Sequence, residues 1–204
     1  MAGKSGNHGS NHRHPPDAEG FRPDGSFFDP DFNAYAIPIT LGEWRVGRRQ
    51  DDMVTTMLGS CIAACIHDPV AGVGGMNHFL LPGKPGDGDT GVAARYGAVA
   101  MDGLLAAVVE AGGWRERLEV KLFGGARLID SGHDIGAENA AFALDYVTQA
   151  GVRLTGRDLG GTLGRRVMFF PATGRAYRRF LLPDMAGVEG EVRQWRRARR
   201  KSTT

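Results

Sequence analysis

The alternation of apolar and polar positions divides the chain into strands and helices. Two segments carry apolar residues at the spacing of a helix that buries one face: residues 92–113 and 135–151. The first of these stops at Gly112-Gly113, a pair typical of a helix end. Strand patterns fall at residues 42–48, 52–58, 61–81 (a hairpin turning near Asp68-Pro69), 118–126, 152–161 and 165–180 (a hairpin turning at Pro171 to Gly174).

The order of these elements predicts the fold class. Strands cluster before the two helices and again after them, which favours an α/β (α+β) three-layer sandwich with a mixed or antiparallel sheet and two main helices. Residues 1–36 are polar, rich in Gly, Pro and Asn, and without a period, so we expect a disordered N-terminal extension. The folded domain is then expected over residues 37–183, followed by a basic C-terminal tail over residues 184–204.

Composition narrows the function classes. The chain has 204 residues, a net charge of +2, two cysteines, and no apolar run near the ~20 residues that cross a membrane. The N-terminus also lacks the apolar core of a signal peptide, so we expect a cytoplasmic protein without a disulfide framework. The body carries no nucleic-acid motif. The basic stretch 193–201 is either an inert solvated tail or an arm for an acidic protein surface or an anionic membrane.

The first hairpin carries the candidate chemistry. A turn centred between Pro69 and Val70 places Cys61 opposite His78, on the same face of the sheet. A thiol beside an imidazole predicts a nucleophile, because an imidazolium lowers the thiol pKa and can later protonate a leaving group. Gly59 and Ser60 precede the cysteine, and their backbone N–H groups are candidates for holding an oxyanion and substrate. The alternative is a small buried cysteine beside a core histidine.

A zinc site is the other chemistry that cysteine and histidine suggest. Cys61, Cys65, His67 and His78 are the candidate ligands. Three of them are spread along one strand over roughly 20 Å, too far apart to surround a single ion. We therefore expect no metal and no other cofactor, and we interpret Cys65 as a buried structural thiol.

The hairpin sequence resembles a known family. The stretch "TTMLGSCIAACIHDPVAGVGGMNHFLLP", followed in order by "RYGAVAMDGLLAAVVEAGG", "VKLFGGARLI", "IGAENAAFALDYV" and "DLGGTLGRRVMFFPATGRA", is similar to the chemoreceptor glutamine deamidases, the CheD family. The resemblance covers roughly residues 41–180. It implies an amidohydrolase of bacterial chemotaxis that deamidates glutamines on methyl-accepting receptors. It also implies a fold shared with deamidating toxins and a CheC-type phosphatase as a possible partner.

The resemblance also implies which residues act. The family's catalytic cysteine falls on Cys61, its histidine on His78, and its threonine, six residues before the cysteine, on Thr55; Thr56 beside it is the possible confusion. The expected reaction passes through a cysteine thioester and releases ammonia, with Thr55 orienting His78 or holding the substrate amide. Two alternatives remain open: a non-catalytic binding module that modulates a CheC-type phosphatase, and a receptor glutamyl methylesterase.

Overall fold

The computed structural model describes residues 21–81, 90–128 and 133–181. The helices are α1 (Thr90–Glu110), α2 (Ile135–Gln149) and the short 3-10 helix η1 (Arg115–Arg117). The strands are β1 (Phe27–Asp29), β2 (Ala34–Pro38), β3 (Trp44–Gly47), β4 (Asp52–Leu58), β5 (Ile62–Asp68), β6 (Val73–Asn77), β7 (Glu119–Gly124), β8 (Arg153–Leu159), β9 (Arg165–Phe170) and β10 (Arg175–Phe180).

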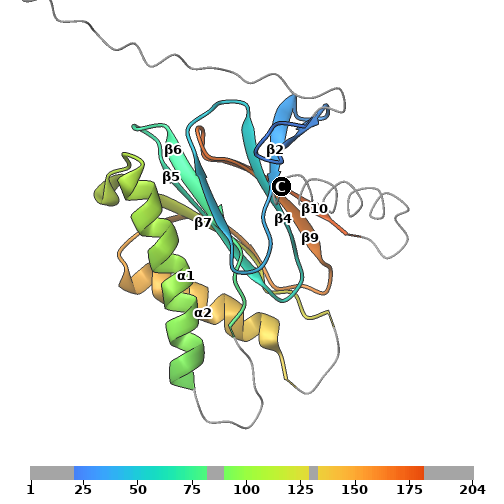
Figure 1. The fold of residues 1–204 in the computed structure, drawn as a ribbon. Coiled ribbons are helices and arrows are strands. Elements are labelled where there is room, and N and C mark those ends of the chain that lie inside the picture. Colours follow the sequence, from blue (N-terminus) through green and yellow to red (C-terminus); the bar gives the residue numbers. More distant parts are fainter. Residues whose placement is uncertain (1–20, 82–89, 129–132, 182–204) are drawn as a thin grey trace, which may run out of the picture.

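The elements form three layers. One sheet, here called the outer sheet, has the strand order β1-β2-β4-β9-β10; the other, the central sheet, has the order β3-β6-β5-β7-β8. Both helices pack on the same face of the central sheet, which leaves its other face against the outer sheet (Figure 1). Each sheet combines antiparallel pairs with one parallel pair, β2 with β4 and β7 with β8. The predicted fold class is therefore confirmed, with the strands divided between two sheets.

Strand β5 lies in the middle of the molecule and is buried along its whole length. Ile62, Ala64 and Ile66 pack in the apolar cluster beneath the helices. Ala63 and Cys65 pack in the cluster between the two sheets. Because side chains alternate along a strand, this burial on both faces explains why β5 reads as an almost continuous apolar run. It also directs every odd-numbered residue here toward the outer sheet.

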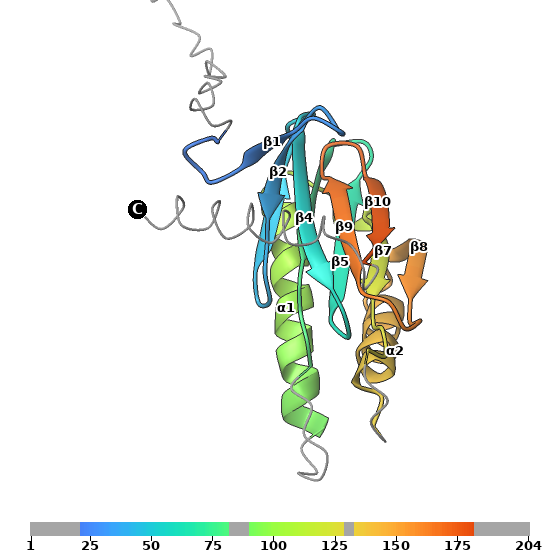
Figure 2. The same cartoon turned by 90° about the vertical axis from the view of Figure 1, so that its right-hand side faces the viewer.

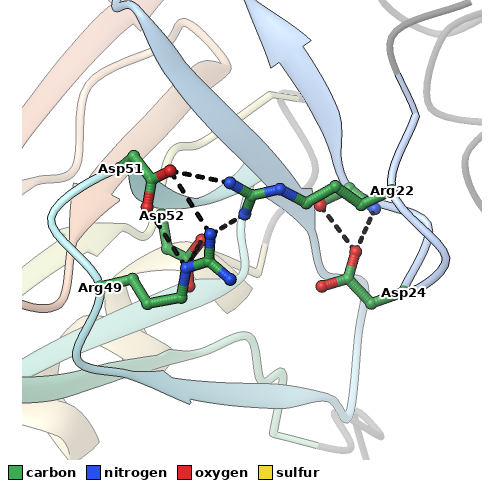
Figure 3. Close-up of polar contacts among 6 residues, drawn as sticks. Arg22, Asp24, Arg49, Asp51 and Asp52 are labelled. Atoms are coloured by element: carbon green, nitrogen blue, oxygen red, sulfur yellow. Dashed lines mark hydrogen bonds and ion pairs between the residues drawn. The ribbon is translucent and has the colours of Figure 1, made fainter. Parts of the chain in front are cut away.

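The N-terminal part of the described chain is ordered, contrary to the expectation of disorder through residue 36. Strands β1 and β2 pair with each other, and β2 pairs with β4 (Figure 2). Arg22 donates to Asp51 and Asp52 at 2.8 Å each, and this ion-pair network ties the segment to the β3–β4 turn (Figure 3). The sequence missed this segment because its strands are short and interrupted by polar turns. Residues 1–20 and the tail 182–204 lie outside the described residues.

The β5–β6 hairpin has a different register from the predicted one. Asp68 pairs with Val73 and Cys65 with Met76, without a break at Gly74 or Gly75. A backbone bridge from Ile62 to Phe79 continues the same register. The turn is thus centred one residue further along the chain, which shifts the facing pairs by two. A shift of two keeps every side chain on its face of the sheet. His78 therefore lies on the predicted face, but Cys61 is not its directly facing partner.

Candidate active site

Cys61 and His78 face the same space between the two sheets. Cys61 immediately precedes β5, is half-buried, and packs against the inter-sheet cluster. His78 immediately follows β6, and its ring reaches the outer sheet, where Nδ1 lies 2.8 Å from Oγ1 of Thr56. In the register of the hairpin His78 is a diagonal neighbour of Cys61 rather than its direct partner. Diagonal neighbours still lie within reach of long side chains.

The side chain of Asn77 holds the backbone beside His78 in place. Its Oδ1 accepts a hydrogen bond from the backbone N–H of Ala64 at 2.9 Å, in place of a backbone carbonyl. Its Nδ2 donates to the carbonyl of Ala100 on α1 at 3.0 Å. On the other side of the strand, the N–H of His78 donates to the carbonyl of Glu43 at 3.0 Å. Asn77 therefore replaces one backbone bond of the β5–β6 pairing, which resumes at Ile62 and Phe79, and fixes the backbone beside the histidine.

Thr56 determines the tautomer of His78. The hydroxyl of Thr56 has one hydrogen, and its geometry to the carbonyl oxygen of Ile39, at 2.9 Å, assigns that hydrogen to Ile39. The short contact to His78 then requires Nδ1–H to donate to the threonine oxygen. The other ring nitrogen, Nε2, is buried and has no hydrogen-bond partner among the described residues. His78 is thus arranged as an acceptor of one proton at Nε2.

Thr55, the threonine expected to orient His78, lies on the opposite face of the outer sheet. Its hydroxyl donates to the carbonyl of Val167 at 2.9 Å and accepts from Nε of Arg166 at 3.2 Å. Val54 and Leu58 of the same strand pack between the sheets, so alternation places Thr56 with them and Thr55 outside. The structure corrects the expected contact: the threonine beside His78 is Thr56.

The loop before β5 exposes one side of its backbone. Its three carbonyls are all bonded: Gly59 accepts from Ala126 N–H at 2.8 Å, Cys61 from Gly125 N–H at 2.9 Å, and Ser60 from the Asn139 amide at 3.1 Å. None of the three backbone N–H groups donates to another residue in the described parts of the chain. Fixed carbonyls and free N–H groups are the arrangement that an oxyanion site needs.

Two partners of this loop were not identified as such from the sequence. Gly124 has φ of 118°, and a Cβ there would lie 1.9 Å from the carbonyl oxygen of Cys61, so only glycine fits. Asn139 of α2 is fully buried, and besides Ser60 its side chain bonds the N–H of Leu81 at 2.7 Å and the carbonyl of Ile135 at 2.8 Å. Asn139 thus joins the cysteine loop to the chain just beyond His78. A polar residue on the buried face of a predicted amphipathic helix was the available signal.

Burial decides the charge states of the pair. Desolvation raises the pKa of the Cys61 thiol above its ordinary value, although a hydrogen bond from its own backbone amide opposes this. Desolvation also lowers the pKa of His78 to about 4, against a smaller opposite effect of Glu43. Both directions are contrary to the expected thiolate–imidazolium pair. At neutral pH the resting site therefore holds a neutral thiol and a neutral imidazole.

Neither a metal centre nor a membrane-spanning helix is found in the part of the chain that the structure describes. No group of three or more His, Cys, Asp and Glu side chains there is arranged to hold a metal ion. Cys65 is fully buried, and burial strongly raises the pKa of its thiol. His67 is bonded through Nδ1 to the carbonyl of Pro171 at 2.9 Å. No described helix combines the length and apolarity that crossing a bilayer requires.

Comparison with known proteins places the chain in a family. A family model described as CheD chemotactic sensory transduction matches residues 80–180. A curated relative from Caulobacter vibrioides, named a probable chemoreceptor glutamine deamidase CheD, is 49% identical over 159 residues, covering 78% of this chain and 84% of the relative. A relative of the same name from Bordetella petrii is 44% identical, covering 82% of this chain and 76% of the relative.

One solved structure shows a weak resemblance to the chain. The crystal structure of Neisseria meningitidis protein NMB0706, described as DUF152, has a TM-score of 0.41 and 14% identity, covering 69% of this chain and 64% of that one. The curated relatives match at much higher identity and over most of their own length. By that similarity the chain belongs to the CheD family.

Proposed function

We propose that this protein hydrolyses the side-chain amide of glutamines on methyl-accepting chemotaxis receptors in the cytoplasm, giving glutamate and ammonia. Membership of a family whose curated members are named chemoreceptor glutamine deamidases supports the reaction and the substrate class. One structural observation carries the mechanism. The unpartnered Nε2 of His78 and the free N–H groups of the Cys61 loop belong to the same inter-sheet end of the fold.

The first half of the proposed reaction forms a thioester. As the Cys61 sulfur attacks the carboxamide carbon, its proton passes to Nε2 of His78, because both groups are neutral at rest. The carbonyl oxygen becomes an oxyanion, which the free N–H groups between Gly59 and Cys61 stabilise. His78 then returns the proton to the amide nitrogen. The carbon–nitrogen bond breaks, ammonia leaves, and a glutamyl thioester remains on Cys61.

The second half hydrolyses the thioester. His78 takes a proton from a water molecule that attacks the thioester carbon, and the same N–H groups hold the second oxyanion. The carbon–sulfur bond then breaks, glutamate is released, and the proton on His78 returns to the Cys61 sulfur. Thr56 keeps Nδ1–H bonded through both halves, so that Nε2 remains the nitrogen that exchanges protons. No cofactor takes part in this scheme.

Mass spectrometry tests the proposal directly. The protein is incubated with cytoplasmic receptor fragments, and glutamine converted to glutamate is located by peptide mapping while ammonia is measured. Hydroxylamine added to the reaction should divert part of the product to a glutamyl hydroxamate, since it attacks a thioester faster than water does. The absence of deamidation with folded protein, together with methanol release from receptors carrying glutamyl methyl esters, would establish the methylesterase instead. A Cys61→Ala protein that still fulfils the chemotaxis role would favour the binding module.

A further inference from the structure

A groove of about 840 Å³ runs between α2 and the end of β8, outside the site described above. Its helical wall consists of small and apolar residues: Ala137, Ala140, Ala141 and Leu144. The opposite wall is the segment that leaves β8 and turns into β9, with Phe180 of β10 beside it. The charged residues that line the groove are Arg157, Asp158 and Arg165.

The groove region carries an excess of positive charge. Asp158 is bonded by Arg165 and also by Arg178, whose Nε lies 2.7 Å from Oδ2 of the aspartate. Arg157 is exposed and has no ion-pair partner among the described residues. The groove region thus holds three guanidinium groups against one carboxylate, and only Arg165 and Arg178 are paired with that carboxylate. An acidic ligand is the complementary occupant of such a surface.

Arg165 adds an unsatisfied donor to the groove. It is 1% exposed, and its two terminal nitrogens donate to Asp158 and to the carbonyl of Gly160. Its remaining nitrogen, Nε, is buried and has no hydrogen-bond partner among the described residues. A buried donor without an acceptor is costly, and most such groups in proteins are satisfied. Arg165 thus adds buried positive charge to the wall of the groove, which favours an acidic occupant.

Backbone hydrogen bonds connect the groove to the cysteine loop. Gly160 N–H donates to the carbonyl of Gly124 at 2.9 Å, and Arg127 N–H donates to the carbonyl of Gly161 at 2.8 Å. The same β7 end bonds the carbonyl of Cys61 through Gly125. The segment after β8 that lines the groove is therefore hydrogen-bonded to the end of β7, and the end of β7 is hydrogen-bonded to the backbone of Cys61.

We propose that this groove is a docking site for an acidic, amphipathic segment of the protein substrate. Its apolar residues pack on the α2 wall, its carboxylates pair with the exposed Arg157, and the buried Arg165 adds to the attraction. The proposal rests on the proposed function for the identity of the substrate, but not for the chemistry of the groove. The chain's own tail is the rival occupant, since it continues from the groove at Leu181. Its basic sequence, residues 193–201, carries the same sign of charge as the groove.

Direct binding tests the groove independently of catalysis. The probe is a fluorescein-labelled peptide of Glu-Ala repeats, with a Lys-Ala peptide as its opposite, followed by fluorescence polarisation with the full-length protein. We expect binding of the acidic peptide alone and a loss of about tenfold in affinity in Arg157→Glu, the size expected for reversing one paired charge. Arg153→Glu is the control: it lies on the same strand, outside the groove, changes the net charge equally, and removes only the exposed ion pair with Glu119.

A steric pair separates the groove from general charge effects. Ala141→Trp fills the groove without changing charge, and Ala106→Trp places the same side chain on an exposed position of α1. We expect Ala141→Trp to weaken acidic-peptide binding and Ala106→Trp to leave it unchanged. Equal losses in Arg157→Glu and Arg153→Glu, or no loss in Ala141→Trp, would overturn the proposal. So would a loss of binding only on truncation after Asp184, because the tail would then be the acidic-peptide site.

Turnover connects the groove to the proposed function. With receptor fragment, Arg157→Glu should raise KM and leave kcat unchanged, whereas a short neutral glutamine peptide should be turned over as by the wild type. A fall in kcat on both substrates would contradict a docking role. Failure of the proposed function itself has a different signature, since then the wild type would release no ammonia from either substrate while acidic-peptide binding stayed intact.

Discussion

The two ends of the β5–β6 hairpin each carry a cysteine and a histidine, and only one end is arranged for chemistry. Cys61 and His78 lie at the open end, where the backbone N–H groups of Gly59 and Ser60 and Nε2 of the imidazole have no partner among the described residues. Cys65 and His67 lie nearer the turn. There the thiol is fully buried between the sheets, and the ring is bonded to Pro171.

The difference lies in what surrounds the same residue types. Near the turn, Gly174 lies against the ring of His67, and the two side chains border only a small cavity of about 120 Å³. At the open end, Asn77 and Asn139 bond the backbone instead, and so hold the loop in place without covering the thiol. A reactive cysteine therefore requires partners that fix its backbone and leave its sulfur and N–H groups free.

The largest expected difference is between replacing Cys61 and replacing Cys65. Cys61→Ala should abolish deamidation, a loss of at least about 10³-fold, because it removes the nucleophile. Cys65→Ala should keep activity within a few-fold and reduce the free energy of unfolding by about 1–2 kcal/mol, because it leaves a small cavity. Ammonia release and urea unfolding measure the two quantities. Equal loss of activity in two folded variants would remove the distinction between the thiols.

Substitutions of the two histidines should differ almost as much in their effect on activity. His78→Gln removes the proton acceptor and should lower kcat by about 10²–10⁴-fold, the range typical of general acid–base catalysis. In the wild type, kcat/KM should rise as pH increases through the His78 pKa of about 4, because only the neutral imidazole accepts a proton. His67→Gln should retain turnover and the same acid limb. If the acid limb disappeared in His67→Gln, the base would be His67 and the assignment to His78 would be wrong.

Neighbouring threonines sharpen the comparison further. Thr56→Val removes the acceptor of the His78 Nδ1 proton and should lower kcat by about tenfold, with KM nearly unchanged. Thr55→Val removes a contact on the far face and should cost about 1 kcal/mol of stability instead. Steady-state kinetics and thermal unfolding of both variants decide between them. Loss of kcat in Thr55→Val alone would restore the residue expected from the family resemblance.

Alkylation by iodoacetamide probes the charge state of the Cys61 thiol at the open end of the hairpin. Cys61 should react and Cys65 should not in the folded protein, since only Cys61 is partly exposed. The rate at Cys61 should keep increasing above neutral pH, because burial raises its pKa above that of an ordinary thiol. A plateau already reached at pH 6–7, and abolished in His78→Gln, would instead demonstrate a resting thiolate–imidazolium pair.

The last difference concerns stability in acid. The pKa of His78 is about 4 in the folded protein, below the ordinary histidine value of 6.5, so the unfolded chain binds the proton first as pH falls. The contribution of neutral His78 to the free energy of unfolding is thus complete above pH 6.5, and it is lost as the pH falls from 6.5 to about 4. It amounts to about 3 kcal/mol at most. His78→Gln should lose correspondingly less stability than the wild type across this window in urea unfolding, whereas equal slopes would show that the ring is not buried as a neutral group.

The sequence by itself determined the elements and their chemistry-bearing residues. Period-two and helical apolar patterns predicted the strands from β3 onward and both helices, and the order of elements predicted the layers. Burial of β5 on both faces follows from its continuous apolar run. The similarity of "TTMLGSC" and "GGMNHFLLP" to a family motif identified Cys61 and His78 as the candidate catalytic residues, because a motif of this kind is a pattern of neighbouring residues.

Only the tertiary structure decided the contacts between segments distant in sequence. The hairpin register depends on where the turn closes, and one residue there moves each facing pair by two. Thr55 and Thr56 are indistinguishable by composition, and the face of β4 that meets His78 is fixed by the packing of two sheets. Asn139 reaches Ser60 because α2 docks on the central sheet. The charge states of Cys61 and His78 follow from burial, which arises only when all three layers are assembled.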